Sequence, residues 1–331
     1  MESYAHPPAH SPAVPLGTHT AYTPPRTPTR AHRLLATARE QLADLEVAPA
    51  MDRLIDGLAT LRRELPREDW QRVVKDECRA HPVIEQIHTA PVTRRAFARP
   101  RGYPGDAETL DLIYGCGQLT QPLSALGAAL YGYELQMTAA QSVRVRREIL
   151  AALINDVCTE NPKARMLSIA CGHLREAERS SAMRTGSFGA FYALDQDQES
   201  LALVERGHGA LGVTTVTGSV RTILTRSTAF DSLDLVYAAG LYDYLDAPVA
   251  AKLTSRMFDM LAPGGRLLVA NFASSLRDAA FMDAFMDWPL IYRTESDVER
   301  FADLIAPNAI ASQRIYRDAP GNVIYLELRR A

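Results

Sequence analysis

The sequence predicts an α/β protein with a parallel sheet and a helical region ahead of it. Three observations support this prediction. Short apolar runs alternate with helical segments in the C-terminal half, small or acidic residues end several of these runs, and the N-terminal half shows helical periodicity alone. Apolar runs separated by helices are typical of a parallel sheet that is covered on both faces. Ligands of such sheets bind beyond the carboxyl ends of the strands, so we expect the site there.

The N-terminal half divides into a tail and a helical region. Residues 1–30 are rich in Pro, Ala, Thr and His and have few large aliphatic side chains, so we expect a disordered tail. Residues 31–160 carry leucines at three- and four-residue steps, which predicts a helical cap or dimerisation region. Within it, residues 99–106 contain two prolines and two glycines, which marks a shaped loop. A homodimer formed through these helices is one expectation.

The C-terminal part, residues 161–331, is predicted to form the sheet. Five apolar runs read as strands: 166–170, 191–194, 213–217, 233–238 and 266–271. Helical stretches such as 198–206 and 248–261 lie between them. Near the end, 309–317 and 322–329 read as two further strands, and Pro320-Gly321 between them is a turn signal. The sequence therefore predicts a C-terminal antiparallel hairpin.

Composition and charge exclude several classes of partner. The chain has 331 residues, 47% hydrophobic and 23% charged, with a formal net charge of −3. This balance gives no electrostatic case for nucleic acid or an anionic membrane, which are bound mainly by Lys and Arg. No apolar run approaches the roughly 20 residues that span a bilayer, so we expect no membrane insertion. The four cysteines form no CxxC pair and the N-terminus has no signal-peptide pattern, so we expect no metal site and a cytoplasmic location.

The residues that follow the predicted strands form a candidate cofactor site. Gly172 follows the first strand and lets the backbone approach a ligand closely. Asp195 ends the second strand, where an acidic residue can accept both hydroxyl groups of a ribose. The third strand is followed by small residues, against which an adenine could lie. The full set of predicted nucleoside contacts is Gly172, Asp195, Gln196, Ser219, Val220 and Ala238.

The loop after the first strand distinguishes two kinds of cofactor. A dinucleotide site needs the pattern G-x-G-x-x-G, which admits a pyrophosphate at a helix N-terminus. Residues 171–176 contain one glycine, and Arg175 and Glu176 occupy positions that would have to be small. A cofactor without phosphates, with a sulfonium and an amino-acid end, meets no such conflict. An NAD-dependent oxidoreductase is therefore the alternative rather than the first choice.

These motifs together resemble the class I SAM-dependent methyltransferases. The stretches that carry the resemblance are 166–178, 192–203, 213–224, 233–245 and 260–271. A narrower similarity, in 101–106, 171–176 and 287–293, is to a bacterial group that includes hydroxy-fatty-acid methyl ester synthases and natural-product methyltransferases. The resemblance implies a Rossmann-like sheet ending in an antiparallel pair. It also implies S-adenosyl-L-methionine (SAM) as cofactor, S-adenosyl-L-homocysteine (SAH) as product, and closure of the loop 99–106 over the cofactor. The chain departs from the family in having one loop glycine, not two or three.

Four residues are candidates for the methionine end of SAM and for the lid. Arg101 suits the carboxylate of SAM, with a surface salt bridge as the alternative. Tyr103 is a candidate lid residue or a plain anchor of its loop. Arg175 and Glu176 suit the carboxylate and the ammonium group of SAM, or else form an ion pair with each other at a helix end.

The expected reaction is an in-line displacement at the SAM methyl carbon, with the protein mainly holding a nucleophile in position. In the class I fold the loop after the fourth strand, here 242–244, faces that methyl group, which makes Tyr242 a candidate catalytic residue. Tyr292 and Arg293 lie between the fifth strand and the hairpin, where acceptor specificity usually lies in such folds. The aromatic residues favour a small aromatic acceptor, such as an indole-type natural-product scaffold. A non-catalytic, dimeric SAM-binding protein is a third interpretation.

Overall fold

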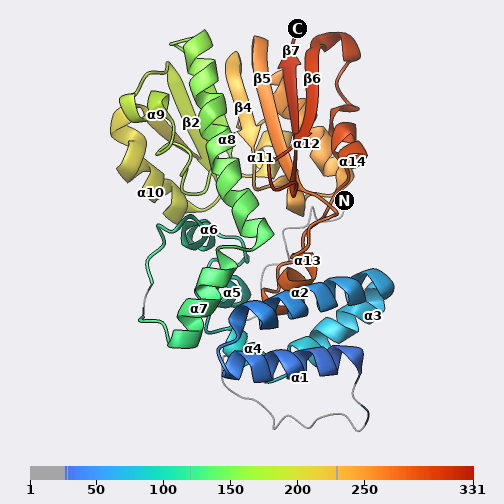
Figure 1. Ribbon diagram of the computed structural model, residues 1–331. Helices are drawn as coiled ribbons and strands as arrows, with labels where there is room; N and C mark the ends of the chain where they lie inside the picture. The colour runs from blue at the N-terminus through green and yellow to red at the C-terminus, as the bar shows by residue number, and fades with distance from the viewer. Residues whose placement is uncertain (1–26, 28, 120, 229) are drawn as a thin grey trace. The chain divides into compact units, whose positions relative to one another are not determined.

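The computed structural model describes residue 27 and residues 29–119, 121–228 and 230–331, whose elements are labelled in Figure 1. The chain divides into two compact units. The first, called the helical unit below, contains Met1–Gln141 and Leu276–Pro289; the second, the sheet unit, contains Ser142–Ser275 and Leu290–Ala331. The predicted tail, 1–30, lies outside the described residues except at its end, where Thr29 caps the first helix.

The helical unit consists of short amphipathic helices. Its elements are α1 (Arg30–Ala43), α2 (Val47–Glu64), α3 (Arg67–Arg72), the π-helical segment η1 (Val73–Cys78), α4 (Val83–Ile87), α5 (Pro91–Ala98), α6 (Ala107–Tyr114), α7 (Ala125–Glu134) and α13 (Ala279–Phe285). Leu35, Ala38 and Leu42 of α1 are buried at the spacing of one helix face, and α1 packs against α2. The leucine periodicity therefore predicted these helices because their buried faces are regular.

One segment of the helical unit comes from far along the chain. Helix α13 lies between the fifth strand and the hairpin in sequence, yet Leu276–Pro289 clusters with the helical unit. Arg62 Nε and Trp70 Nε1 donate hydrogen bonds of 2.8 and 3.1 Å to Asp283 Oδ2 on this segment. Pairing between residues so distant in sequence has no local signal, which is why the expected boundaries did not include it.

The boundary at residue 160 also differs from the structure. Helix α8 (Thr138–Glu160) ends at the expected residue, but its residues from Ser142 onward cluster with the sheet unit. Leu150, Ile154 and Val157 on this helix are buried. The helical region expected over 31–160 is thus shorter at its C-terminal end and gains residues 276–289.

The sheet unit contains one mixed sheet of seven strands. The strands are β1 (Arg165–Ile169), β2 (Ala190–Asp195), β3 (Val213–Thr217), β4 (Leu233–Ala238), β5 (Leu261–Phe272), β6 (Ile310–Arg317) and β7 (Val323–Arg330). Their order is β3-β2-β1-β4-β5-β7-β6, with β1 to β5 parallel and β7 antiparallel to both of its neighbours. This confirms the predicted α/β Rossmann-like sheet with its C-terminal antiparallel hairpin.

Strand β5 begins five residues before the predicted strand. Leu261 pairs with Leu233, and the register shifts before Arg266 pairs with Leu235. A Cβ atom at Gly265 would lie 2.6 Å from the carbonyl oxygen of Leu233, so this close approach requires glycine. Gly264 and Gly265 are therefore part of the irregular first half of β5.

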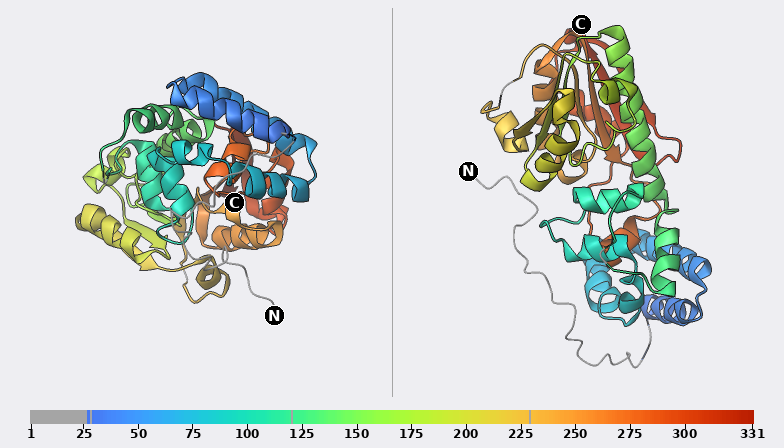
Figure 2. Two further views of the ribbon diagram at one scale, coloured as in Figure 1. Left: turned by 90° about the horizontal axis from the view of Figure 1, so that it is seen from below. Right: turned by 90° about the vertical axis from the view of Figure 1, so that its left-hand side faces the viewer.

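Helices cover both faces of the sheet. The connecting helices are α9 (Ser181–Thr185), α10 (Gln198–His208), η2 (Gly209–Leu211), α11 (Val220–Leu224), η3 (Tyr242–Tyr244), α12 (Ala247–Asp259), α14 (Glu295–Glu299), η4 (Arg300–Ala302) and η5 (Pro307–Ala309). Helix α8 lies along one face and α12 along the other (Figures 1 and 2). Leu253 and Met257 of α12 belong to the same buried cluster as Leu167 of β1 and Val236 of β4. Within the described part of the chain, no helix combines the length and hydrophobicity needed to cross a membrane.

Candidate functional site

The strand order places the candidate site between the carboxyl ends of β1 and β4. The chain runs from β1 to β2 and β3 on one side of the sheet, then returns to add β4 and β5 on the other side. At such a reversal the loops after the two central strands diverge and leave a crevice, where ligands of open α/β sheets bind. Every residue considered next on this edge belongs to the sheet unit.

The loop after β1 has an unusual backbone. Ala170, Gly172 and Leu174 have φ angles of 54°, 52° and 51°, in the left-handed region. Left-handed backbone costs a residue other than glycine about 1–2 kcal/mol, so two such residues in one loop have to be stabilised by their surroundings. Strained residues of this kind cluster at ligand-binding sites. The glycine spacing in the sequence did not predict that Ala170 and Leu174 also have left-handed backbone.

Asp195 joins the loop after β1 to the end of β2. Its Oδ2 accepts a hydrogen bond of 2.8 Å from the Gly172 amide, and its Oδ1 accepts one of 2.9 Å from the Asp197 amide. The side chain is 7% exposed. Burial raises the pKa of Asp195, and these backbone amides oppose the shift by stabilising the carboxylate. Gly172 and Asp195, predicted separately, are thus brought into direct contact.

The other predicted nucleoside contacts lie along the same edge. The Gly218 amide donates a 2.9 Å hydrogen bond to the carbonyl oxygen of Asp195, which ties the end of β3 to the end of β2. Ser219 and Val220 follow, both half-buried, and Val220 begins α11. Gln196 is exposed after β2, and Ala238 is the buried last residue of β4.

Arg175 and Glu176 have different partners in the structure. Arg175 pairs with the exposed Glu178 at 2.5 Å. Glu176 is buried, and its Oε1 accepts a 2.6 Å hydrogen bond from the Tyr237 hydroxyl group. Burial raises the pKa of Glu176, while the Tyr237 hydrogen bond and the positive charge of Arg146 lower it. Their expected contacts with the methionine end of SAM stay a prediction.

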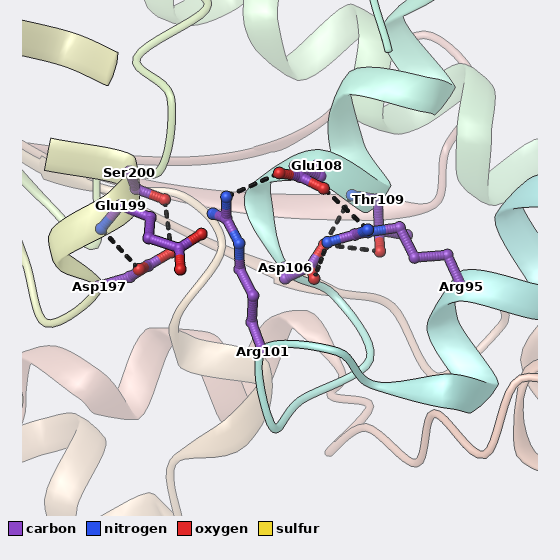
Figure 3. Close-up of polar contacts among 8 residues, drawn as sticks. All are labelled: Arg95, Arg101, Asp106, Glu108, Thr109, Asp197, Glu199 and Ser200. Atoms are coloured by element: carbon purple, nitrogen blue, oxygen red, sulfur yellow. Dashed lines mark hydrogen bonds and ion pairs between the residues drawn. The ribbon is translucent and has the colours of Figure 1, made fainter. Parts of the chain in front are cut away.

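Arg101 and Tyr103 belong to the helical unit. Arg101 Nη2 lies 2.8 Å from Glu108 Oε1, so it forms the salt bridge that was its alternative role (Figure 3). The loop ends at Asp106, a fully buried residue that caps α6 and receives two hydrogen bonds from Arg95, of 3.0 and 2.6 Å. Tyr103 is half-buried in the turn between these anchors. The closure of this loop over a cofactor stays a prediction.

The structure corrects the expected position of Tyr242. Its ring is fully buried on the side of α12, where the hydroxyl group lies 2.8 Å from Thr254 Oγ1. Phe301 packs against the same ring at a centroid distance of 5.1 Å. The phenol is a core group here, so it does not fit the catalytic role that its place after β4 suggested.

Arg293 is also a structural residue in this arrangement. Its Nη1 donates hydrogen bonds to the Tyr242 carbonyl oxygen at 2.8 Å and to Asn271 Oδ1 at 2.5 Å, and Nη2 donates to the Leu245 carbonyl oxygen at 2.5 Å. The guanidinium group is 5.0 Å from the Phe301 ring centroid. Arg293 therefore holds the loop after β4 in place, which corrects its expected role toward the acceptor. Tyr292 is half-buried, and its role stays a prediction.

Two charged residues at this edge are buried. Asp243 is 4% exposed, and burial raises its pKa to about 6, although the Phe272 amide, Arg146 and Arg293 lower it. Arg146 of α8 is 6% exposed and donates a 2.6 Å hydrogen bond to the carbonyl oxygen of Ala239, just after β4. The sequence pointed to the loop 242–244 without distinguishing Asp243, and Arg146 was one member of a basic helical run. Among the described residues, no group of three His, Cys, Asp or Glu side chains is placed to hold a metal.

The sheet order and the hairpin define a Rossmann-like α/β protein, and Gly172 and Asp195 are in contact at the carboxyl edge of its sheet. Neither protein-family models nor curated proteins match the sequence. Among solved structures, the chain is similar to a possible exported protein from Bordetella parapertussis. The two are 16% identical, with a TM-score of 0.59 over 91% of this chain and 96% of the other. At this identity the likeness shows the fold alone.

Weaker likenesses are to two methyltransferases with bound SAH. One is magnesium protoporphyrin IX methyltransferase (ChlM) from Synechocystis PCC 6803, 13% identical over 66% of this chain and 91% of that one, with a TM-score of 0.45. The other is the N-methyltransferase NodS from Bradyrhizobium japonicum WM9, 15% identical over 56% and 85%, with a TM-score of 0.41.

Proposed function

We propose that the protein is a SAM-dependent methyltransferase that acts on a small molecule. The observation that carries this proposal is the contact between Asp195 and the Gly172 amide at the carboxyl ends of β2 and β1. It sets an acidic acceptor beside a close-approach glycine, which is the arrangement a ribose requires. The Gly172 and Asp197 amides each donate to one carboxylate oxygen and the Gln196 amide also stabilises the group, which leaves acceptor capacity for the ribose hydroxyl groups.

The backbone after β1 favours SAM over a dinucleotide. A pyrophosphate is bound by the N-terminus of a helix that begins directly at the glycine loop. Here the described chain continues through turns after Gly172, and helix begins only at Ser181, with the five-residue α9. The loop therefore offers no helix N-terminus to a pyrophosphate. SAM has no phosphate, and when bound it supplies an activated methyl group.

We assign each part of the cofactor to one part of the edge. Ser219 and Val220 after β3 border the adenine, Asp195 and Gln196 after β2 hold the ribose, and Arg175 and Glu176 take the methionine end. Ala238 leads to the methyl position. The buried carboxylate of Glu176 suits the ammonium group because an opposite charge compensates for its desolvation.

We propose as acceptor a small aromatic molecule, of an indole or other natural-product type, with half-buried Tyr292 of the sheet unit as one contact. An aromatic lining suits a sulfonium because a cation is attracted to the face of a ring. A cytoplasmic location and a homodimer formed through the helical unit belong to the same proposal.

Calorimetric titration of the full chain with SAM, SAH and NADH tests the cofactor. We expect micromolar binding of SAH, no binding of NADH, and loss of SAH binding in Asp195→Ala. Asp234→Ala is a matched control, because Asp234 Oδ2 accepts a backbone amide, that of Arg165, at 2.7 Å at the opposite end of the strands. Binding of NADH without SAH would overturn the proposal, as would SAH affinity that Asp195→Ala and Asp234→Ala reduce equally.

A further inference from the structure

Asp243 is a buried carboxylate that bridges the ends of two strands. It lies in η3, just after β4, and its Oδ1 accepts a 2.7 Å hydrogen bond from the amide of Phe272, the last residue of β5. Its own carbonyl oxygen accepts a 2.8 Å hydrogen bond from the Ile291 amide. Both the backbone and the side chain of Asp243 are therefore fixed at the carboxyl edge of the sheet.

The neighbouring contacts make this position rigid. The guanidinium group of Arg293 donates to the carbonyl oxygens of Tyr242 and Leu245, which flank η3 on both sides. The Phe272 amide donates to Oδ1 and the amide of Asp243 itself also stabilises the carboxylate, whose four lone pairs still leave acceptor capacity for a ligand. Asp243 is therefore a carboxylate held in a fixed position near the end of a central strand, with acceptor capacity left on its side chain.

The sheet order relates Asp243 to the proposed cofactor. With adenine over β3 and ribose over β2, the 5′ substituent of the nucleoside extends toward β1 and β4, because these strands follow in the sheet. Neighbouring strands are about 4.8 Å apart, so the end of β4 lies about 10 Å from the end of β2. The sulfonium and its methyl group extend part of this way, which leaves room for an acceptor molecule between the methyl carbon and the end of β4.

We propose that Asp243 is a catalytic residue, the proton acceptor for an acceptor molecule that presents a hydroxyl or amine group to the methyl carbon. This inference rests on the proposed methyltransferase function and narrows its substrate class to protic nucleophiles. As the oxygen or nitrogen forms its bond to the methyl carbon, the carbon–sulfur bond breaks and its electron pair stays on sulfur, giving SAH. The proton of the hydroxyl or amine group passes to the carboxylate of Asp243.

The charges around Asp243 agree with this role. Arg146 from α8 and Arg293 from the segment after β5 both favour its carboxylate form, and burial opposes them, which leaves the pKa at about 6. A carboxylate with that pKa is ionised at neutral pH and still basic enough to accept a proton. Below pH 6 it becomes protonated and can no longer act as a base.

A comparison of two ligands tests the position of Asp243 without a known acceptor. Sinefungin has a carbon bearing a protonated amine where SAM has its methylated sulfonium, whereas SAH has an uncharged sulfur. We expect the wild-type chain at pH 8 to bind sinefungin about 10-fold more tightly than SAH, since a charge-assisted hydrogen bond contributes about 1.5–3 kcal/mol. In Asp243→Asn the preference should fall below about 2-fold while the Kd for SAH is unchanged. The wild-type preference should also disappear at pH 5.

The matched control is Asp246→Asn, which makes the same change in charge three residues away. Asp246 is exposed and caps α12 through the Val249 amide, a role that asparagine fills equally well. This variant should keep the sinefungin preference. Equal affinity for both ligands in the wild type, or a preference that survives in Asp243→Asn, would overturn the inference and leave the proposed function standing. Failure of both ligands to bind would instead remove the proposed function.

Discussion

The two units use buried carboxylates in different ways. In the helical unit, Asp106 and Glu134 accept hydrogen bonds at helix N-termini and from hydroxyl or guanidinium groups. In the sheet unit, Asp195 and Asp243 follow parallel strands and accept amides from neighbouring loops. The four have similar burial, so burial alone does not distinguish them.

The carboxylates of the two units differ in how much hydrogen-bond acceptor capacity remains for a ligand. Asp106 is paired with Arg95 through both oxygens and also accepts from the amide and hydroxyl group of Thr109. Such a carboxylate has its acceptor capacity filled by the protein and stabilises its own unit. The backbone amides that bind Asp195 and Asp243 fix the positions of these carboxylates without using all of their hydrogen-bond acceptor capacity. A buried acid is therefore a better site candidate when amides at strand ends, rather than charged side chains, hold it.

The largest expected effect is on Asp106. Asp106→Ala leaves the partly buried Arg95 without this partner and removes the cap of α6, so the free energy of unfolding should fall by about 3–5 kcal/mol. Urea unfolding followed by tryptophan fluorescence measures this, because both tryptophans, Trp70 and Trp288, belong to the helical unit. Glu108→Ala removes an exposed carboxylate that pairs with the same arginine, and should cost under about 1 kcal/mol. Equal losses in the two variants would contradict the comparison.

The second-largest expected effect is a change in the free energy of unfolding with pH, caused by Glu134 of the helical unit. Burial raises the pKa of Glu134 from 4.5 to about 7, against hydrogen bonds from Thr93 and Val92. The folded state then binds more protons than the unfolded state between these values, so Glu134 lowers stability as pH rises from about 4.5 to 7. The decrease should be on the order of 3 kcal/mol, and Glu134→Gln should remove it. The same fluorescence-monitored unfolding at several pH values measures the difference, and parallel curves for wild type and variant would disprove this role of Glu134.

A smaller effect tests whether Arg293 holds the loop after β4 or binds the acceptor. Arg293→Met leaves buried carbonyl oxygens of Tyr242 and Leu245 without this donor, which should destabilise the loop after β4 by about 2 kcal/mol. Hydrogen exchange of peptides that cover residues 242–245 should accelerate. Arg300→Met changes an exposed arginine nearby and serves as the control. Unchanged exchange in Arg293→Met would return Arg293 to the list of acceptor-binding candidates.

The smallest effects on stability are expected in the loop after β1. Arg175 and Glu178 form a partly exposed pair, so Arg175→Gln and Glu178→Gln should each change stability by under about 0.5 kcal/mol. Their effects on ligand binding should differ. If Arg175 binds the carboxylate of the methionine end, Arg175→Gln weakens SAH about 10-fold and Glu178→Gln leaves it unchanged. Titration of both variants with SAH decides this, and identical Kd values would exclude Arg175 from the site.

Much of the sheet unit could be predicted because its signals are local. A buried parallel strand is a run of apolar residues, and the turn at Gly321, with φ of 78°, requires a residue that tolerates left-handed backbone. The positions of Gly172 and Asp195 followed from the same strands, since a parallel sheet brings the carboxyl ends of its strands to one edge. Their hydrogen bond was a consequence of this order.

Side-chain direction after β4 could not be predicted in this way. Tyr242 and Asp243 are adjacent, but the first turns into the core against Thr254 and the second turns to the amide of Phe272. The direction of each side chain depends on α12 and β5, both of which come later in the chain. The expectation for Tyr242 therefore missed the burial of its ring against Thr254.

By itself, the sequence determined the elements, their order along the chain and the residues at the strand ends, because periodicity and turn chemistry act over a few neighbours. Only the tertiary structure decided that Arg293 holds the loop after β4, that Arg146 reaches Ala239, and that residues 276–289 belong to the helical unit. These facts depend on hydrogen bonds between segments that are far apart in sequence. Such bonds are selected by the packing of whole elements, and no local pattern encodes which partner a buried charge will find.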